Sequence, residues 1–358
     1  MAYQNVGTPR FYINVIEWLN SLNAVTLSST WTGSSAHYNT LPVVLETLTT
    51  ALTATNVPKG VMTDQSFVAV LGHTMATDGD TYHMMNDSAN VFWTGLTDVT
   101  NGDISSGTVT PGYDGFSITL FNSGETLIEG GGIAFNVPDN NAKLGSVIIG
   151  SYYDMPHSPG LKLTMLREMD GVKRERTKGG NDLVHHKYFR SPKWGNLPAW
   201  EQSYNATNPP SADYYSSSRV GRKTWDLSWN YVRGSDLFGA NESLGNYNPP
   251  DPNYSFLGGY YPMVDLDSDT INSYGDDASY TEDIGNYFNS NLLTDDNFFS
   301  QVIHKTNGGQ LPFIFQPDSN NNNPDQFAIC KFDIKRGFQF KQVAKGLYNI
   351  KLKIREVW

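Results

Sequence analysis

The sequence predicts a mainly β protein, and three observations support this fold class. Charged residues make up only 17% of the 358 residues and aromatic residues 13%, which suits a loop-rich β protein with a neutral polar surface. Short apolar and polar alternations are separated by Gly, Asn and Asp, as in antiparallel sandwiches. The strongest alternations, "GRKTWDLSWNYV" and "GLYNIKLKIREVW", have a period of two. We expect a jelly-roll-like sandwich in residues 1–155 and a second β-rich domain, with one short helix and long loops, in 156–358.

The spacing of apolar residues in the first 60 positions predicts local structure. Residues 9–22 have helical spacing and predict a short entry helix or an extended arm, the apolar positions being Tyr12, Val15, Ile16, Leu19 and Leu22. Residues 24–60 are rich in Thr and Ser with β-branched residues, which favours strands with polar faces. A helix stays open for the second part of this segment, "LPVVLETLTTALTAT".

The sandwich strands follow. Residues 67–71 form a continuous apolar run stopped by Gly72, which predicts a strand buried on both faces. The next segments, "DGFSITLFNS", "GGGIAFNVPD" and "KLGSVIIGSYYDMP", predict further strands. In the first two, apolar residues alternate with polar ones: Phe116, Ile118 and Leu120, then Ile133, Phe135 and Val137. The prolines and glycine of "MPHSPG" then favour a hinge near residue 157.

One basic stretch, "LREMDGVKRERTKGG", stands out in an acidic chain. Its cations are Arg167, Lys173, Arg174, Arg176 and Lys178. We interpret it as a solvated β-hairpin that turns at Asp170-Gly171 rather than as a dedicated anion site. Such a hairpin could dock on the acidic face of a neighbouring subunit.

The two strongest alternations define strands of the second domain. In the first, one face carries Trp225, Leu227, Trp229 and Tyr231, and we expect that face to be core rather than an exposed sugar-binding stripe. In the second, one face carries Tyr348, Ile350, Leu352 and Ile354. The opposite face of this closing strand is lined by lysine, which we expect to protect a sheet edge from uncontrolled pairing.

Between these strands lie long loops and one helix. Residues 191–219 and 239–291 are irregular, and we expect them either to contact neighbouring subunits or to decorate the surface. A short helix is predicted in "LLTDDNFFSQVIHKTNGGQ", capped by Thr294 or Asp295, ending before Gly308 and carrying the apolar stripe Phe298, Phe299, Val302 and Ile303. After it, "LPFIFQP" and "FAICKFD" predict two antiparallel strands joined by an Asn-rich connector.

Charge and composition exclude several classes of function. A formal net charge of −11 argues against a nucleic-acid-binding surface and against a basic genome-packing arm. The first 25 residues lack the pattern of a signal peptide, and no window has the roughly 18 apolar residues of a membrane span. Cys330 is the only cysteine, so no intrachain disulfide forms, which fits assembly in a reducing cytoplasm. In its apolar segment we expect inert packing rather than a nucleophile.

The candidate sites for chemistry are weak. The chain has an alternating acidic pattern similar to a calcium loop, formed by Asp265, Asp267 and Asp269 with Asp276 at the twelfth position. Thr270 stands where such a loop needs a glycine, so we expect a solvated acidic loop and predict no metal. The histidines are scattered, at His37, His73, His83, His157, His185, His186 and His304. Adjacent His185 and His186 would face opposite sides of a strand. With no phosphate loop or nucleophile elbow, we predict no catalytic residue and no cofactor, although a pair of acids for glycoside hydrolysis stays open.

The second half of the chain resembles a family of known proteins. The segments "GSYYDMPHSPGLKLTMLREMDGVKRERTKGGNDL", "GRKTWDLSWNYV" and "LPFIFQPDSNNNNPDQFAICKFD", with the closing "YNIKLKIREVW", are similar to virion structural (tail) proteins of environmental tailed bacteriophages. The order of a Trp strand, a short helix, "GGQLPFIF" and a closing strand also resembles distal-tail and tail-tip proteins. The resemblance covers roughly residues 145–358.

The resemblance implies an architectural function without catalysis. It implies a ring-forming distal-tail or baseplate protein whose partners are copies of itself and other tail proteins. The first half is similar to the carbohydrate-binding jelly rolls of phages, which implies attachment to a host-surface glycan, without residues that can be assigned to the sugar. Two alternatives stay open: a tail-associated polysaccharide depolymerase, and a capsid or decoration protein. No nucleic acid and no membrane insertion are expected, and the expected location is the virion tail, assembled in the host cytoplasm.

Overall fold

The fold is mainly β, with large antiparallel sheets and few short helices, as the sequence predicts. The structure is a computed structural model, and it describes residues 7–29, 46–47, 51–55, 65–86, 96–122, 130–136, 143–160, 164–168, 172–186, 193–194, 197–198, 222–238, 296–334 and 337–357. The jelly-roll topology of the first half stays a prediction.

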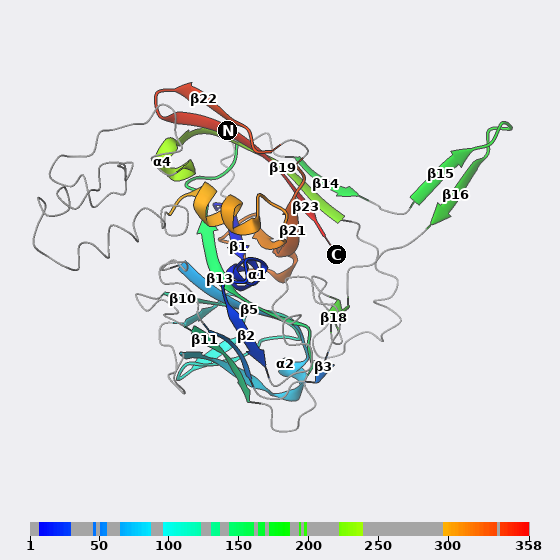
Figure 1. The fold of residues 1–358 in the computed structure, drawn as a ribbon. Helices are drawn as coiled ribbons and strands as arrows, with labels where there is room; N and C mark the ends of the chain where they lie inside the picture. The colour runs from blue at the N-terminus through cyan, green and yellow to red at the C-terminus, as the bar shows by residue number, and fades with distance from the viewer. Residues whose placement is uncertain are drawn as a thin grey trace, which may run out of the picture.

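One antiparallel sheet runs through both halves of the sequence (Figure 1). Its strands lie in the order β14 (Thr164–Glu168), β19 (Arg222–Arg233), β23 (Leu347–Glu356), β21 (Ala328–Phe332), β20 (Phe313–Gln316), β1 (Arg10–Ile13), β13 (Ser146–Asp154), β5 (Gln65–His73), β10 (Gly115–Asn122) and β7 (Leu96–Asp98). An additional strand, β22 (Phe340–Ala344), pairs with β23. Among the described strands, the sheet therefore ends at β14 on one side and at β7 on the other.

A second sheet packs on one end of the first. Its order is β2 (Thr26–Ser29), β4 (Ala51–Thr55), β11 (Gly130–Asn136), β6 (Thr81–Asn86), β9 (Thr108–Thr110) and β8 (Asp103–Ser105). Three two-stranded pairs complete the strands: β3 (Glu46–Thr47) with β12 (Lys143–Leu144), β15 (Val172–Arg176) with β16 (Asp182–His186), and β17 (Lys193–Trp194) with β18 (Leu197–Pro198). The helices are α1 (Val15–Ser21), α2 (Met75–Asp78), α4 (Gly234–Leu237), the π-helix η3 (Phe299–Ile303), and the 3-10 turns η4 (His304–Thr306) and η5 (Pro324–Gln326).

The core lies on both faces of the large sheet. On one face, β5, β10 and β13 contact the second sheet and α1 through a cluster that includes Val68, Val147, Tyr82, Ile133 and Trp18. Farther along the sheet, η3 and α4 pack on the cluster that contains Phe11, Trp229, Phe313, Val302 and Leu237. The other face buries Phe67, Ile118, Ile148, Ile314 and Phe327. This arrangement explains the uninterrupted apolar run of β5, which is buried on both faces as predicted.

The strand β10 differs from the expected pattern of one buried and one polar face. Ser117 and Thr119, which alternate with its apolar residues, are also buried. Both hydroxyl groups form hydrogen bonds with the hydroxyl of Tyr82 on β6, at 2.7 and 2.8 Å. The polar face of this strand can therefore be buried against the second sheet, because its hydroxyl groups find hydrogen-bond partners there.

The N-terminal segment is a strand followed by a helix, so of the two alternatives expected for 9–22, a short helix and an extended arm, the helix covers only Val15–Ser21 and an extended strand precedes it. In β1, Tyr12 pairs with Tyr152 of β13 on one side and with Ile314 of β20 on the other. Asn14 then caps α1, because its side chain accepts a hydrogen bond from the Glu17 amide at 3.1 Å. The first described strand of the chain thus lies between the two halves of the sequence.

The division predicted at residue 155 stays a prediction, but the chain around it is tied to its neighbours. The Met155 amide donates to the Pro9 carbonyl at 3.0 Å. The Trp229 indole donates to the His157 carbonyl at 3.0 Å, and the Gly160 amide to the Ser228 carbonyl at 2.7 Å. The segment predicted to be a hinge is therefore hydrogen-bonded along β19.

The Trp strand β19 is a core strand, with one correction. Trp225, Leu227 and Trp229 are buried as predicted, but Tyr231 is 68% exposed and has a φ of 61°. A register shift between Trp229 and Val232 places Val232 in the core instead, where it is 1% exposed. This bulge cannot be read from the alternation, because it depends on the pairing with β23.

The closing strand β23 alternates as predicted but is not an edge. Tyr348, Ile350, Leu352 and Ile354 are buried, and Lys351 and Lys353 are exposed. The strand pairs with β19 on one side and with β21 and β22 on the other. Its lysines therefore line a solvent-facing surface of the sheet and do not protect an edge.

The predicted pair of strands before it is confirmed. Phe313 pairs with Cys330 and Phe315 with Ala328 in β20 and β21. The helix before them is of the π type, and the expected caps Thr294 and Asp295 lie outside the described residues. Within the described part, the Asn297 side chain accepts a hydrogen bond from the Ser300 amide at 2.9 Å. Asn307 and Gly308 follow with positive φ, as expected where a helix ends.

Candidate functional site

Several residues considered for chemistry lie outside the described part of the chain. They are His37, the acidic loop with Asp265, Asp267, Asp269, Thr270 and Asp276, and almost all of the long segments 191–219 and 239–291. Within the described residues, no group of three or more His, Cys, Asp or Glu side chains is arranged to hold a metal ion. In the same part of the chain, we find no helix with the length and apolarity needed to cross a membrane.

The described histidines do not form a common site. His73 is fully buried at the end of β5, and its Nδ1 accepts a hydrogen bond from the Met75 amide at 3.4 Å. Burial lowers the pKa of His73 to about 3, so this side chain is neutral and packs as a core residue. His304 packs edge-on against Trp18, with ring centroids 5.3 Å apart. His185 and His186 are consecutive residues of β16.

Two other buried groups have shifted pKa values. Cys330 is fully buried in β21, and this burial raises the pKa of its thiol, which keeps it protonated and unreactive. The sequence gives no indication that Lys305 is buried, yet it has no exposed surface, and its Nζ donates to Gln301 Oε1 at 2.7 Å. Burial lowers the pKa of Lys305 to about 7. Both residues belong to the packing around η3 and β21 rather than to an open cleft.

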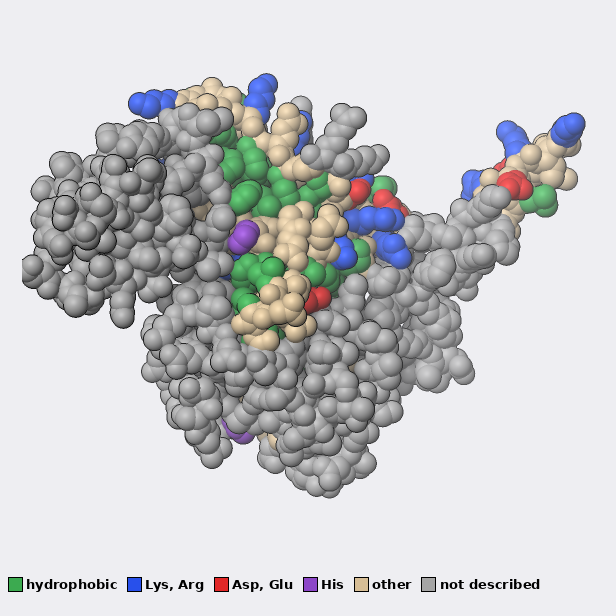
Figure 2. All heavy atoms as spheres, in the orientation of Figure 1, with side chains coloured by type: hydrophobic (Ala, Val, Ile, Leu, Met, Phe, Trp, Pro, Cys, Tyr) green, Lys and Arg blue, Asp and Glu red, His purple; other side chains and the backbone are tan. Residues whose placement is uncertain are grey.

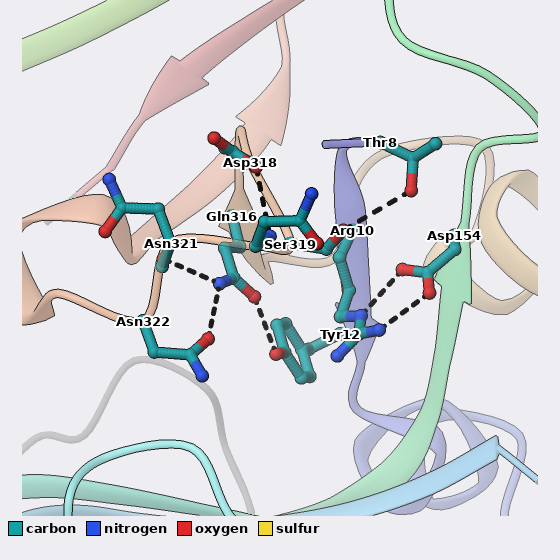
Figure 3. A network of polar contacts seen from close by, with 10 residues as sticks. Thr8, Arg10, Tyr12, Asp154, Gln316, Asp318, Ser319, Asn321 and Asn322 are labelled. Atoms are coloured by element: carbon teal, nitrogen blue, oxygen red, sulfur yellow. Dashed lines mark hydrogen bonds and ion pairs between the residues drawn. The ribbon is translucent and has the colours of Figure 1, made fainter. Parts of the chain in front are cut away.

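The polar network of Figure 3 joins the N-terminal strand to the Asn-rich connector. The Arg10 guanidinium forms a two-point ion pair with Asp154, at 2.6 and 2.7 Å. The Tyr12 hydroxyl donates to Gln316 Oε1 at 2.8 Å, and Gln316 Nε2 donates to the Asn321 carbonyl at 2.9 Å.

The Asn-rich connector is also held from the N-terminal side. Asp318 accepts a hydrogen bond from the Gly7 amide at 2.7 Å, and the Ser319 amide donates to the Thr8 carbonyl at 3.0 Å. The run of asparagines is therefore docked on the start of the chain. Because these polar groups satisfy one another, we interpret the network as a structural connection rather than a ligand site.

The edge strand β14 is the clearest exposed feature of the large sheet. Among the described strands it pairs with β19 alone, as the last strand in the order. Met165 is 59% exposed and Leu166 is 52% exposed. Consecutive residues of a strand face opposite sides, so both faces of β14 are uncovered as well as its outer edge. An exposed apolar edge strand is a ready template for pairing with another chain.

The basic stretch forms a hairpin, but not the one predicted. A turn at Asp170-Gly171 would pair 164–168 with 172–176, whereas β14 pairs with β19 and β15 pairs with β16. The turn lies at Thr177–Asn181, where the Thr177 amide donates to the Asn181 carbonyl at 2.8 Å and Gly180 has a φ of 84°. The prediction was wrong because β14 pairs with β19, more than fifty residues further along the chain, instead of with β15.

This hairpin projects from the body of the protein (Figure 1, Figure 2). Leu183 is 60% exposed and Val184, the next residue, 42%. A two-stranded hairpin without a covered face is marginally stable in water, which makes β15 and β16 a candidate for contact with another surface. Arg174, Arg176 and Lys178 are exposed along it, and Arg176 forms an ion pair with Asp182 at 3.8 Å.

The exposed strand β14 and the β15–β16 hairpin are therefore the candidate association surface of the described residues. Residues 172–186 contain four Lys and Arg against two Asp and Glu, in a chain of net charge −11. Sequence analysis identified the basic residues, but it missed Met165 and Leu166, whose exposure follows only from the strand order. We compared the chain with models of known families, curated proteins and solved structures, and found no match in any of the three.

Proposed function

We propose that the protein is a structural component of a bacteriophage virion, a ring-forming distal-tail or baseplate protein. In this proposal its partners are copies of itself and other tail proteins, and it is assembled in the host cytoplasm. The sandwich of the first half serves attachment to the host surface. The function is architectural, and no catalytic residue or cofactor is assigned.

The observation that carries this proposal is the exposed edge strand β14. A subunit built for a ring needs a surface that continues into the next copy, and pairing at a sheet edge supplies main-chain hydrogen bonds for that contact. The exposed Met165 and Leu166 add apolar area that a neighbouring subunit would bury.

The hairpin supports the same function by its charge. A basic arm on an acidic chain attracts another copy of that chain, because opposite charges on the two surfaces favour the encounter and fix its orientation. The hairpin also projects away from the body of the protein (Figure 1). An arm of this kind can pack against a neighbouring subunit, which would cover the hairpin face that its own chain leaves exposed.

Association is tested with the purified full chain by native mass spectrometry and by electron microscopy. We expect a closed oligomer with cyclic symmetry. The double variant Met165→Glu, Leu166→Lys should dissociate it, because charges on the edge oppose strand pairing. Leu22→Glu is the matched control, since Leu22 is 53% exposed at the end of α1, outside the proposed surface. A strictly monomeric wild-type protein would refute the proposed ring.

The location is tested separately on intact phage particles with a gold-labelled antibody against this chain. The label is expected at the end of the tail. Label on the head would favour the capsid or decoration alternative. If particles carry no label, the proposal of a virion protein is wrong.

A further inference from the structure

A cavity of about 590 Å³ opens beside the strands β19 and β23. Near its C-terminal end β23 is paired by β21, and near its N-terminal end by β22. Between these two partners the chain leaves the sheet, and the described residues Asp333, Ile334, Gly337 and Phe338 form one wall of the cavity. The volume falls in the range of small-molecule sites, roughly 300 to 1,000 Å³.

The floor of the cavity is a polar stretch of sheet. Across the two strands, Asp226 pairs with Lys353 and Ser228 with Lys351. Asn230, next along β19, also lines the cavity. These side chains include charged groups of both signs and both donors and acceptors of hydrogen bonds. They lie on two adjacent strands, on the solvent-facing side of the sheet.

One wall combines an ion pair with an aromatic ring. The Asp333 amide donates to the Lys353 carbonyl at 2.8 Å, and the Asp333 carboxylate forms an ion pair with the Lys353 side chain at 2.8 Å, so Asp333 is held beside the cavity by two contacts. Phe338 packs edge-on against Phe332, with ring centroids 5.1 Å apart. Phe332 is only 7% exposed within the core, so it anchors Phe338 beside the cavity. The cavity thus offers a held apolar surface next to fixed polar groups.

We propose that this cavity binds a neutral carbohydrate. Among the lining residues that the structure describes, two carboxylates and two lysines balance in charge, which favours a neutral ligand over an anionic or a cationic one. Hydroxyl groups both donate and accept, so a polyhydroxylated ligand can satisfy carboxylate, amide, hydroxyl and ammonium partners together. The less polar face of a sugar ring can contact Phe338 and Ile334.

This inference deepens the host-attachment part of the proposed function and rests on it for its biological meaning. It assigns a second place for sugar binding, on the large sheet rather than in the N-terminal sandwich. The strands β19 and β23 contribute Trp229 and Ile350 to a core cluster, and Ile334 and Phe338 of the cavity wall pack against the same cluster. A site built on such rigid strands is pre-organised, which limits the entropy lost on binding.

The test uses the full chain and a panel of neutral gluco-, manno-, galacto- and N-acetylglucosamine oligosaccharides, with an oligouronate as the charged comparator. Binding is measured by titration calorimetry and saturation-transfer NMR at up to millimolar sugar. We expect at least one neutral oligosaccharide to bind, and the oligouronate to bind more weakly. In Asp226→Ala and Asn230→Ala, each of which removes an exposed side chain, binding should weaken about tenfold. Lys341→Ala, an exposed lysine of β22 outside the cavity, is the matched control and should bind as the wild type does.

Native mass spectrometry of the same variants separates this inference from the proposed ring. Loss of sugar binding with an unchanged oligomer supports the carbohydrate site. The inference is overturned if no neutral oligosaccharide binds, if the oligouronate binds more tightly, or if the two variants bind like the control. It is also overturned if the variants dissociate the oligomer, because the cavity would then belong to a subunit contact. A monomeric protein that binds sugar through Asp226 and Asn230 would refute the ring and leave the site intact.

Discussion

The bulge in β19 leads to a quantitative prediction about two aromatic residues of one strand. Trp229 has no exposed surface, and its indole donates to the His157 carbonyl. Truncation of a buried Trp to Ala costs about 3 to 5 kcal/mol, and the carbonyl left without its donor adds about 1 kcal/mol. We therefore expect Trp229→Ala to lower the free energy of unfolding by about 5 kcal/mol, a large part of the roughly 5 to 15 kcal/mol that stabilises a protein.

Tyr231 is the matched position, because simple alternation would place it on the same face as Trp229. It is 68% exposed, so Tyr231→Ala should change the free energy of unfolding by less than about 0.5 kcal/mol. Its φ of 61° strains any residue with a Cβ, and Tyr231→Gly should therefore be neutral or stabilising by up to about 1 kcal/mol. Urea unfolding followed by far-UV circular dichroism measures all three variants. Equal losses for Trp229→Ala and Tyr231→Ala would refute the bulge.

Three further predictions concern buried charge. Asp154→Ala should lower the free energy of unfolding in urea by about 2 to 3 kcal/mol, because it leaves the mostly buried Arg10 guanidinium without its two-point partner. Asp333→Ala, from a more exposed ion pair, should lower it by under about 1 kcal/mol. Equal losses for the two variants would contradict this assignment. Burial lowers the pKa of His73 to about 3, so the folded state resists protonation and stability should fall as the pH drops from about 6.5 toward 3. His73→Phe should flatten that acid dependence of the unfolding midpoint, and an unchanged slope would contradict it. Burial also lowers the pKa of Lys305 to about 7, so Lys305→Met should stabilise the protein by about 2 kcal/mol at pH 7. This gain should shrink as the pH rises toward 10.5, where the lysine is neutral in the unfolded chain too. A loss of stability at pH 7 would refute this reasoning.

Much of the fold could be predicted from the sequence, because strands buried on one or both faces leave a local pattern. The runs in β5, β19 and β23 were identified with the correct buried faces for Trp225, Trp229 and Ile350. The pair β20 and β21 was also predicted correctly, since a turn-rich connector separates two apolar segments. In each of these elements, the deciding information lies within a few neighbouring residues.

The errors have a common physical cause, which is pairing between distant segments. The hairpin turn was misplaced because β14 pairs with β19 rather than with its sequence neighbour β15. The central position of β1, between β13 and β20, joins residues 138 to 306 positions apart. Tyr231 faces solvent because the register with β23 shifts beside it. None of these pairings leaves a signal in the local alternation.

The same limit applies to the candidate association surface. The basic residues of the hairpin could be recognised from composition alone. Met165 and Leu166, in contrast, read as ordinary core residues of a strand, and only the strand order places them at the end of the sheet. The cavity next to Lys351 and Lys353 likewise depends on the gap between β21 and β22.

Amide hydrogen exchange of residues 164–168 tests most directly whether β14 is the edge at which copies of this protein join. The comparison is between the wild-type assembly and the Met165→Glu, Leu166→Lys variant, with exchange followed by mass spectrometry. If a neighbouring copy covers this strand, its amides exchange slowly in the wild-type assembly and much faster in the dissociated variant. Equally fast exchange of this segment in both samples would show that no neighbour covers it, and the account of how the subunits associate would then be wrong.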